Sequence, residues 1–165
     1  MFAFAIWNRE ELFLARDRLG IKPLYYCENL GRFRFASTPQ ALIAAGGVDT
    51  SIDAVALHHL FTLHAVVPAP RTILNGIRKL APGTTLTVNA RGELCHRKYW
   101  SLKAQRPAQS AAQSEWGEAE WTEAIHDSLR QAVKKRIEIA DVKVGVLLSG
   151  GLDSSLLVAL LAEQG

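Results

Sequence analysis

A short run of small residues near the C-terminus constrains this 165-residue chain more than any other feature. Apolar residues at 144–148, several of them β-branched, predict a buried parallel strand, and the apolar run at 156–162 predicts a buried helix. Between them lies a loop with the sequence Ser149-Gly150-Gly151-Leu152-Asp153-Ser154-Ser155. A strand, a glycine-containing loop and a helix in this order are typical of the start of a parallel α/β domain.

This loop has the chemistry of a phosphate site. Two adjacent glycines let the backbone approach an oxyanion, serine hydroxyls add donors, and the following helix would present free N–H groups. Asp153 is a poor neighbour for a phosphate unless Mg²⁺ bridges the two, so Asp153 is the predicted metal contact. A Walker A loop is excluded, because it places a lysine after its second glycine. The alternative is a plain glycine-serine turn between a core strand and a core helix.

Composition limits the other classes of function. Hydrophobic residues make up 48% of the chain, enough for a packed core, and the net charge of +3 is small and spread along the chain. The tight basic cluster at 134–136 is explained by a solvated helix face, so no nucleic-acid partner is predicted. No run of about 18 apolar residues occurs, so no membrane partner is predicted either. Cys27 and Cys95 lack metal-ligand spacing, and we expect both in the core of a cytoplasmic protein.

The first hundred residues alternate short apolar runs with turn signals, which is typical of a β-rich domain. Four strands are predicted in the order of a β-meander, at 2–7, 12–16, 24–27 and 32–37. The arms 84–88 and 94–100 predict a hairpin. In the connection 17–23, Gly20 is free to take a positive φ. We expect ion pairs among four charged residues to pin this turn, namely Arg16, Asp17, Arg18 and Lys22.

Three helices are predicted outside the loop region. Thr38 is a candidate N-cap, Pro39 fits the first helical position, and Gly46 fits the stop of a short helix. A second helix begins near Asp53, and its expected buried stripe consists of Val55, Leu57, Leu60 and Phe61. Apolar residues four positions apart predict a long amphipathic helix through Trp121, Ile125, Leu129, Val133 and Ile137.

The loop resembles the pyrophosphate-binding loop of the ATP pyrophosphatases, whose pattern is Ser-Gly-Gly-hydrophobic-Asp-Ser and which cleave ATP between the α and β phosphates. Further blocks, taken together and in order, resemble the glutamine-hydrolysing asparagine synthetases along nearly the whole chain: 1–7, 15–26, 35–37, 68–73, 76–83 and 145–155. Within that family, residues 57–59 together with 64–74, and Thr38 after Ser37, are more similar to the N-acetylglutaminylglutamine amidotransferases.

The resemblance implies an α/β enzyme of two domains. Residues 1–100 would be the C-terminal half of an α+β glutaminase domain of the N-terminal-nucleophile type, rich in antiparallel strands. Residues 101–114, rich in Ala, Gln and Ser, would be a linker. Residues 115–165 would open an ATP-pyrophosphatase-type domain with its first βα unit. Because a parallel sheet needs several such units, we expect the chain to be an internal piece of a longer enzyme.

Site residues and ligands also follow from the resemblance. Leu148 would contact the adenosine of ATP, and the pyrophosphate loop would consist of Ser149, Gly150, Gly151, Leu152, Asp153 and Ser154. Asp153 would contact Mg²⁺. The implied partners are glutamine and a carboxylate acceptor, either N-acetylglutaminylglutamine or aspartate, and a homodimer is a candidate assembly.

The chain departs from the family pattern at the nucleophile. The family uses a Cys at the mature N-terminus, whereas position 1 is Met and both cysteines fall within predicted strands. We therefore expect the isolated chain to be inactive. The leading interpretation is part of a glutamine-dependent, ATP-consuming enzyme that makes an amide from N-acetylglutaminylglutamine, and the alternatives are asparagine synthetase or a non-catalytic remnant. A tRNA-thiolation enzyme is disfavoured, because that class does not need residues 1–100.

Overall fold

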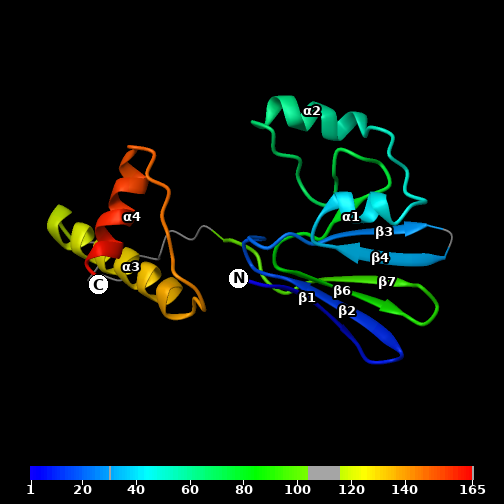
Figure 1. The fold of residues 1–165 in the computed structure, drawn as a ribbon, viewed down its shortest axis with the longest axis horizontal. Coiled ribbons are helices and arrows are strands. Elements are labelled where there is room, and N and C mark those ends of the chain that lie inside the picture. Colours follow the sequence, from blue (N-terminus) through cyan, green and yellow to red (C-terminus); the bar gives the residue numbers. More distant parts are fainter. Residues whose placement is uncertain (30, 104–115, 165) are drawn as a thin grey trace. The chain divides into compact units, whose positions relative to one another are not determined.

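The computed structural model describes residues 1–29, 31–103 and 116–164, and the chain divides into two compact units, Met1–Lys103 and Ala104–Gly165 (Figure 1). From residue 104 onward, the predicted linker lies outside the described residues. The fold mixes α-helices with antiparallel sheets, as the sequence predicts. Within the described residues, no helix is both long and apolar enough to cross a membrane.

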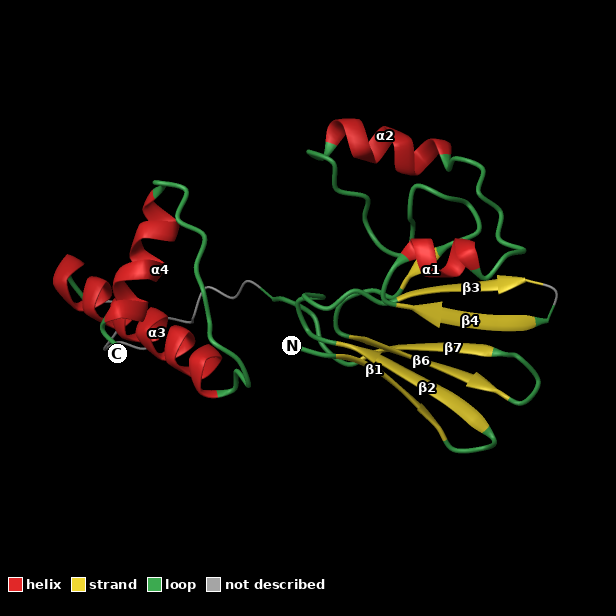
Figure 2. Cartoon of the chain, in the orientation of Figure 1, coloured by secondary structure: helices red, strands yellow, loops and turns green. Residues whose placement is uncertain are grey.

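The first unit is built on two antiparallel sheets (Figure 2). The larger sheet has the order β1-β2-β6-β7, with β1 at Ala3–Trp7, β2 at Glu11–Arg16, β6 at Thr84–Asn89 and β7 at Leu94–Lys98. The smaller sheet has the order β4-β3-β5, with β4 at Arg32–Ala36, β3 at Tyr25–Asn29 and β5 at Arg78–Lys79. The six predicted strands are confirmed with shifts at their ends. The predicted meander is wrong, because β2 pairs with β6 and the chain then passes to the other sheet.

A shared core joins the two sheets. Leu14 of β2 lies opposite Leu86 of β6, and neither side chain has any exposed surface. Tyr26 of β3 belongs to the same buried cluster. The whole cluster consists of Leu14, Leu24, Tyr26, Leu80, Leu86 and Val88. The inward faces of the two sheets therefore pack against one another as a sandwich.

Helix α1, Pro39–Ala44, covers the other face of the smaller sheet. Thr38 caps it as predicted, because its side chain accepts a hydrogen bond from the Ala41 N–H at 3.4 Å. Leu42 of α1 is 2% exposed and packs with Cys27 and Ile77. Cys27 alternates with Tyr26 along β3, so it points away from the sandwich core. This second cluster therefore lies between α1 and the sheet.

Helix α2, Ala54–Thr62, begins after Asp53 as predicted, but its predicted buried stripe is wrong. Val55 is 46% exposed and Phe61 is 79% exposed, whereas Ala56 is fully buried. Leu57 and Leu60 are half-buried. The helix is fixed at its first turn by the Asp53 cap, and this fixes its rotation so that the Ala56 side faces the unit.

The second unit consists of two helices that pack against each other, α3 at Glu118–Glu138 and α4 at Leu152–Ala162. The long helix is confirmed, but the predicted strand at 144–148 is wrong, since these residues form no strand and Leu147 is 95% exposed. A parallel strand exists only where a neighbour completes its hydrogen bonds, and no strand occurs within 116–164. Helix α4 includes the predicted 156–162 segment, but only Leu160 is buried, because α3 covers one side of it.

Candidate functional site

The candidate nucleotide loop connects an extended segment to the start of α4. Gly150 has φ +81°, a left-handed conformation that favours glycine, and it reverses the chain direction. Gly151 follows as the N-cap of α4, with no side-chain cap of its own. The first backbone N–H groups of a helix lack acceptors within that helix. The loop therefore directs an uncapped, electropositive helix start toward solvent.

Two serines close this loop. The hydroxyl oxygens of Ser149 and Ser154 lie 3.0 Å apart, and the Ser149 N–H donates to Ser154 Oγ at 3.3 Å. Ser154 Oγ donates to the Gly151 carbonyl at 3.1 Å, and the Gly151 N–H donates weakly to Ser149 Oγ at 3.5 Å. The structure thus brings together two serines and two glycines, which the sequence analysis assigned to one phosphate site.

The other predicted site residues surround this loop without joining its hydrogen bonds. Leu148 is 61% exposed before the loop, and Leu152 is 84% exposed as the first residue of α4. Asp153 lies in the first turn of α4 and is exposed. No group of three or more potential metal-ligating His, Cys, Asp or Glu side chains occurs among the described residues. Asp153 can supply one oxygen to Mg²⁺, which commonly takes its other ligands from phosphates and water.

In the first unit, Asp17 organises the turn after β2. Its Oδ1 accepts N–H groups of Leu19 at 3.2 Å and Ile21 at 3.0 Å. Its Oδ2 accepts N–H groups of Lys22 at 2.9 Å and Phe2 at 3.3 Å. Burial by itself would raise the pKa of Asp17, but the four backbone donors outweigh it and hold the pKa below its ordinary value. Asp17 therefore joins the start of the chain to residues 17–24, which connect β2 of the larger sheet to β3 of the smaller sheet.

Arg16 fixes the same passage from its other side. Its guanidinium donates to the carbonyls of Lys22 at 2.9 Å, Gly20 at 2.7 Å and Leu80 at 2.5 Å. Gly20 has φ +67°, as the sequence predicts. The predicted structural role of Arg16 and Asp17 is confirmed, but the predicted ion pairs are wrong. Side-chain bonds to the backbone pin this turn, because its peptide groups would otherwise lack partners.

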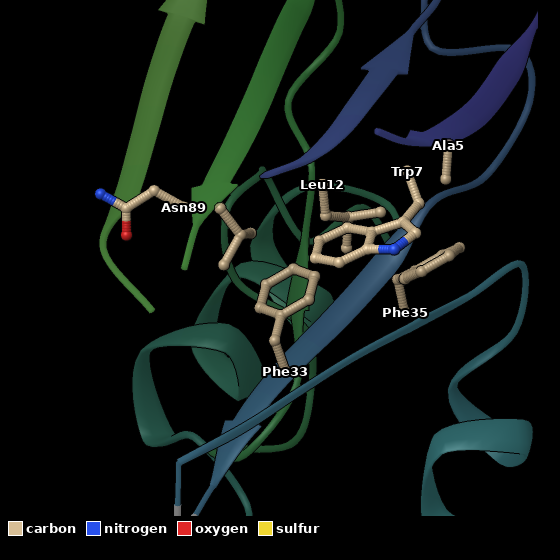
Figure 3. Close-up of a pocket in the computed structure, with 7 residues that line it drawn as sticks. Ala5, Trp7, Leu12, Phe33, Phe35 and Asn89 are labelled. Atoms are coloured by element: carbon tan, nitrogen blue, oxygen red, sulfur yellow. The ribbon is translucent and has the colours of Figure 1, made fainter. Parts of the chain in front are cut away.

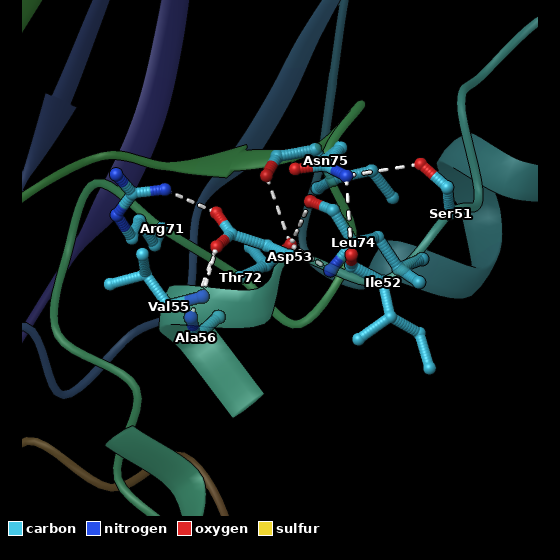
Figure 4. A network of polar contacts seen from close by, with 10 residues as sticks. Ser51, Ile52, Asp53, Val55, Ala56, Arg71, Thr72, Leu74 and Asn75 are labelled. Carbon is cyan, nitrogen blue, oxygen red and sulfur yellow. Dashed lines mark hydrogen bonds and ion pairs between the residues drawn. The ribbon is translucent and has the colours of Figure 1, made fainter. Parts of the chain in front are cut away.

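A second polar network holds α2 to the segment 71–77 (Figure 4). Asp53 Oδ1 accepts the N–H groups of Val55 at 2.9 Å and Ala56 at 3.1 Å, and its Oδ2 forms an ion pair with Arg71. The Ala56 bond contributes most to lowering the pKa of Asp53; burial opposes it, and Arg71 reinforces it. Buried Thr72 donates to the Ile77 carbonyl at 2.9 Å. This network gives the segment 71–77 a fixed path although it contains neither a helix nor a strand.

The sequence analysis missed an aromatic cavity of about 440 Å³ (Figure 3). It is lined by Ala5, Trp7, Leu12, Phe33, Phe35, Val88 and Asn89. The available signal was alternation, since Trp7 shares a strand face with Ala5 and Phe33 shares one with Phe35. None of the lining side chains titrates near neutral pH, so the cavity has no acid or base for catalysis.

The cysteines are also not arranged for catalysis. Cys27 is 2% exposed in β3, and burial raises the pKa of its thiol, with Arg34 opposing more weakly. Burial therefore disfavours the reactive thiolate. Cys95 lies in β7, and its predicted core position is wrong because it is exposed. It points away from the sandwich, since it alternates with Leu94, which packs on the core.

Comparisons with known proteins match both units. A model of the glutamine amidotransferase domain matches residues 1–100, and a model of asparagine synthase matches residues 124–165. The chain is 35% identical over 165 residues to asparagine synthetase [glutamine-hydrolyzing] 1 of Bacillus subtilis, covering 99% of the chain and 24% of that protein. It is 31% identical over 164 residues to amidase chyE of Penicillium rubens, covering 98% and 23%. The chain thus spans about a quarter of the length of these relatives.

Proposed function

This chain belongs to the glutamine amidotransferase domain family, and we propose that it works as part of a glutamine-dependent, ATP-consuming ligase. In this proposal residues 1–100 belong to the domain that releases ammonia from glutamine, 101–114 form a linker, and 115–165 open the domain that activates a carboxylate. The match of residues 124–165 to the asparagine synthase model supports the second assignment.

The proposed reaction solves a problem of activation. A carboxylate is a poor electrophile, so one of its oxygens attacks the α-phosphate of ATP and pyrophosphate leaves. Ammonia then attacks the carbonyl carbon of the adenylate, giving the amide and AMP. A bound Mg²⁺ would neutralise charge that develops on the phosphates. The loop contributes backbone N–H groups and the Ser149 and Ser154 hydroxyls, which would hold the departing pyrophosphate.

One observation carries this assignment: the closed turn of Ser149, Gly150, Gly151 and Ser154 at the uncapped start of α4. Asp153 on the first helical turn would hold the metal, and Leu148 would contact adenosine. The two hydroxyls, the glycine turn and the free helix N–H groups lie within one short loop, which is the arrangement that a phosphate site needs.

The proposed acceptor is N-acetylglutaminylglutamine, and the competing acceptor is aspartate. The similarity of residues 57–59 and 64–74 to the dipeptide amidotransferases supports the first. The asparagine synthetases among the relatives support the second. Because an amidase is also among the relatives, membership of the family does not by itself identify the acceptor.

The experiment uses a protein of the relatives' full length that contains these residues. AMP release is measured with ATP and glutamine, first with aspartate and then with N-acetylglutaminylglutamine. Release with the dipeptide alone supports the proposal, and release with aspartate alone makes the protein an asparagine synthetase. Release with neither contradicts the ligase assignment. Size-exclusion chromatography of the same preparation tests the proposed homodimer.

The 165 residues alone should hydrolyse no glutamine. Cys27 is buried and Cys95 lies on a strand, so neither cysteine has the terminal α-amino group that serves the family nucleophile as its base. A glutaminase assay of the isolated chain checks this expectation. Ammonia release that disappears in the Cys95→Ser variant would contradict it.

A further inference from the structure

Two residues of β7 with basic side chains occupy inward positions of the sandwich. His96 lies opposite Leu86 and Lys98 lies opposite Thr84, and both of these β6 partners are buried. Directly opposed residues of an antiparallel pair share one face of the sheet. His96 and Lys98 therefore face the smaller sheet, and both side chains are exposed at the edge of the sandwich.

The smaller sheet presents a matching cation from its own edge. Arg78 of β5 lies opposite Tyr26, which belongs to the shared core, so Arg78 also faces inward. The ring centres of Tyr26 and His96 are 6.0 Å apart, which brings the two sheets together at this point. Strands β5 and β7 are edge strands of their sheets. Inward-facing cations from two edges thus converge at one opening of the sandwich.

A cavity of about 430 Å³ lies between these edges. Its cationic lining residues are Arg78, Lys79 and Lys98, and the His96 imidazole and the hydroxyl-bearing residues Tyr26 and Thr84 lie beside them. No carboxylate lines it, and none of the ion pairs within 1–103 and 116–164 involves these residues.

The positively charged residues around the cavity repel one another. Burial lowers the pKa of Lys79, and the neighbouring Arg16 lowers it further. Burial also raises the pKa of Tyr26, and Arg78 acts on that hydroxyl more strongly than Glu28 does. Because no carboxylate lines the cavity and no ion pair among the described residues includes Arg78, Lys79 or Lys98, the cavity is electropositive.

We propose that this cavity binds a small oxyanion of the phosphate class, with Arg78 and Lys98 as its main contacts. Arginine supplies paired donors suited to phosphate oxygens, and lysine supplies a point charge that a phosphate neutralises. An alternative role for these charges is to keep an edge strand from pairing with other chains. That role does not require the cations of two different edges to face one cavity. The site shares no residue with the loop at 149–154 and does not depend on the proposed function.

The test is an NMR titration of the 165-residue chain with inorganic pyrophosphate and with orthophosphate, each compared with sodium chloride at equal ionic strength. Resonances of Arg78 and His96 report on the cavity, and resonances of Gly150 and Gly151 report on the loop. The proposal predicts saturable shifts at Arg78 and His96 that chloride does not reproduce. Shifts at the loop alone would overturn it and leave the proposed function standing.

Variants that each remove positive charge distinguish specific binding in the cavity from general electrostatic attraction of the anion. Arg78→Gln with Lys98→Gln should weaken binding at His96 by about tenfold or more, since two charge-assisted contacts are lost. Arg97→Gln removes one positive charge, as Lys98→Gln does, but from a residue of β7 that points to the opposite face. Arg97→Gln should weaken anion binding less than about threefold. Equal weakening by Arg97→Gln and Lys98→Gln alone would overturn the proposal. Lys98→Gln also replaces the double variant if that one does not fold.

Discussion

The two compact units differ in what holds them together. Residues 1–103 contain a core shared by two sheets, and their carboxylates Asp17 and Asp53 are bound by backbone N–H groups. In residues 116–164 only Leu160 is fully buried, and every ion pair joins partly exposed side chains. Such surface pairs contribute little to stability. The first unit is thus stabilised by its interior, whereas the second depends on one helix contact and local bonds.

The comparison explains an otherwise odd feature of α4. Its sequence is apolar on all sides, which is typical of a helix covered all round, yet Leu152 is 84% exposed and Leu157 is 42% exposed. The exposed segment before it includes Leu147 at 95%. Under the proposed function, further parts of the synthetase domain would cover these surfaces.

Truncating a core leucine should have the largest effect on stability and should affect the two units differently. Leu86→Ala should reduce the free energy of unfolding of the first unit by about 2–5 kcal/mol, because Leu86 is fully buried between the sheets. Leu160→Ala should cost the second unit less than half as much, because α4 can settle against its single neighbour. Hydrogen exchange followed separately in each unit measures both values. Equal losses would break the comparison.

Removing the Asp17 carboxylate should have the next largest effect. Asp17→Asn replaces an acceptor oxygen by an NH₂ group that faces N–H donors, so it should destabilise the first unit by about 2–3 kcal/mol. Asp127→Asn, which breaks an exposed ion pair in the second unit, is the matched control and should cost less than about 1 kcal/mol. Urea unfolding of both variants checks the difference. A smaller loss for Asp17→Asn would contradict the assigned role of its four bonds.

Acidification should destabilise the first unit through the same carboxylates. Asp17 and Asp53 have folded-state pKa values below the ordinary one, so their contribution is fully present above the unfolded pKa of about 3.9. It is lost as the pH falls through the lower, folded pKa. Thermal unfolding of the first unit should therefore shift to lower temperature in this range. The acid-induced fall in unfolding temperature should be smaller in Asp17→Asn than in the unmodified chain. The same fall in both proteins would argue against this linkage.

Changing the loop glycine should have a smaller effect. Gly150→Ala places a Cβ at φ +81°, where no neighbouring atom obstructs it, so only the backbone conformation is penalised, by about 1–2 kcal/mol. The free energy of unfolding of the second unit measures this cost. Gly145→Ala, a change in the preceding extended segment with no positive φ and no close atom, is the control. Similar costs for the two variants would show that the loop does not require its turn.

Local features were the most predictable from sequence. Thr38 and Asp53 cap their helices as predicted, since a cap needs only its own side chain and the next few N–H groups. The hairpin of β6 and β7 follows from a single turn. By contrast, the pairing of β2 with β6 joins residues such as Leu14 and Leu86, far apart in the chain, and no local pattern specifies it. The apolar run at 144–148 failed as a strand because no pairing neighbour completes it.

The candidate site was predictable in part for the same reason. The sequence pattern located Ser149 to Ser154 within one loop, and their contacts are local. The cationic cavity could not be predicted, although alternation along β7 sets His96 and Lys98 on one face. Arg78, which lies in the other sheet, joins them only through the packing of the two sheets.

The most direct test of the central claim is Asp153→Asn in a protein of the relatives' full length. Glu123→Gln, at an exposed residue of α3 that forms no ion pair among the described residues, removes the same charge and serves as control. Pyrophosphate release from ATP and ammonia release from glutamine are measured for each. Asp153→Asn should lower the rate of pyrophosphate release by about a hundredfold or more, while glutamine hydrolysis persists and the control variant keeps both activities. Undiminished pyrophosphate release in Asp153→Asn would contradict a nucleotide site at this loop.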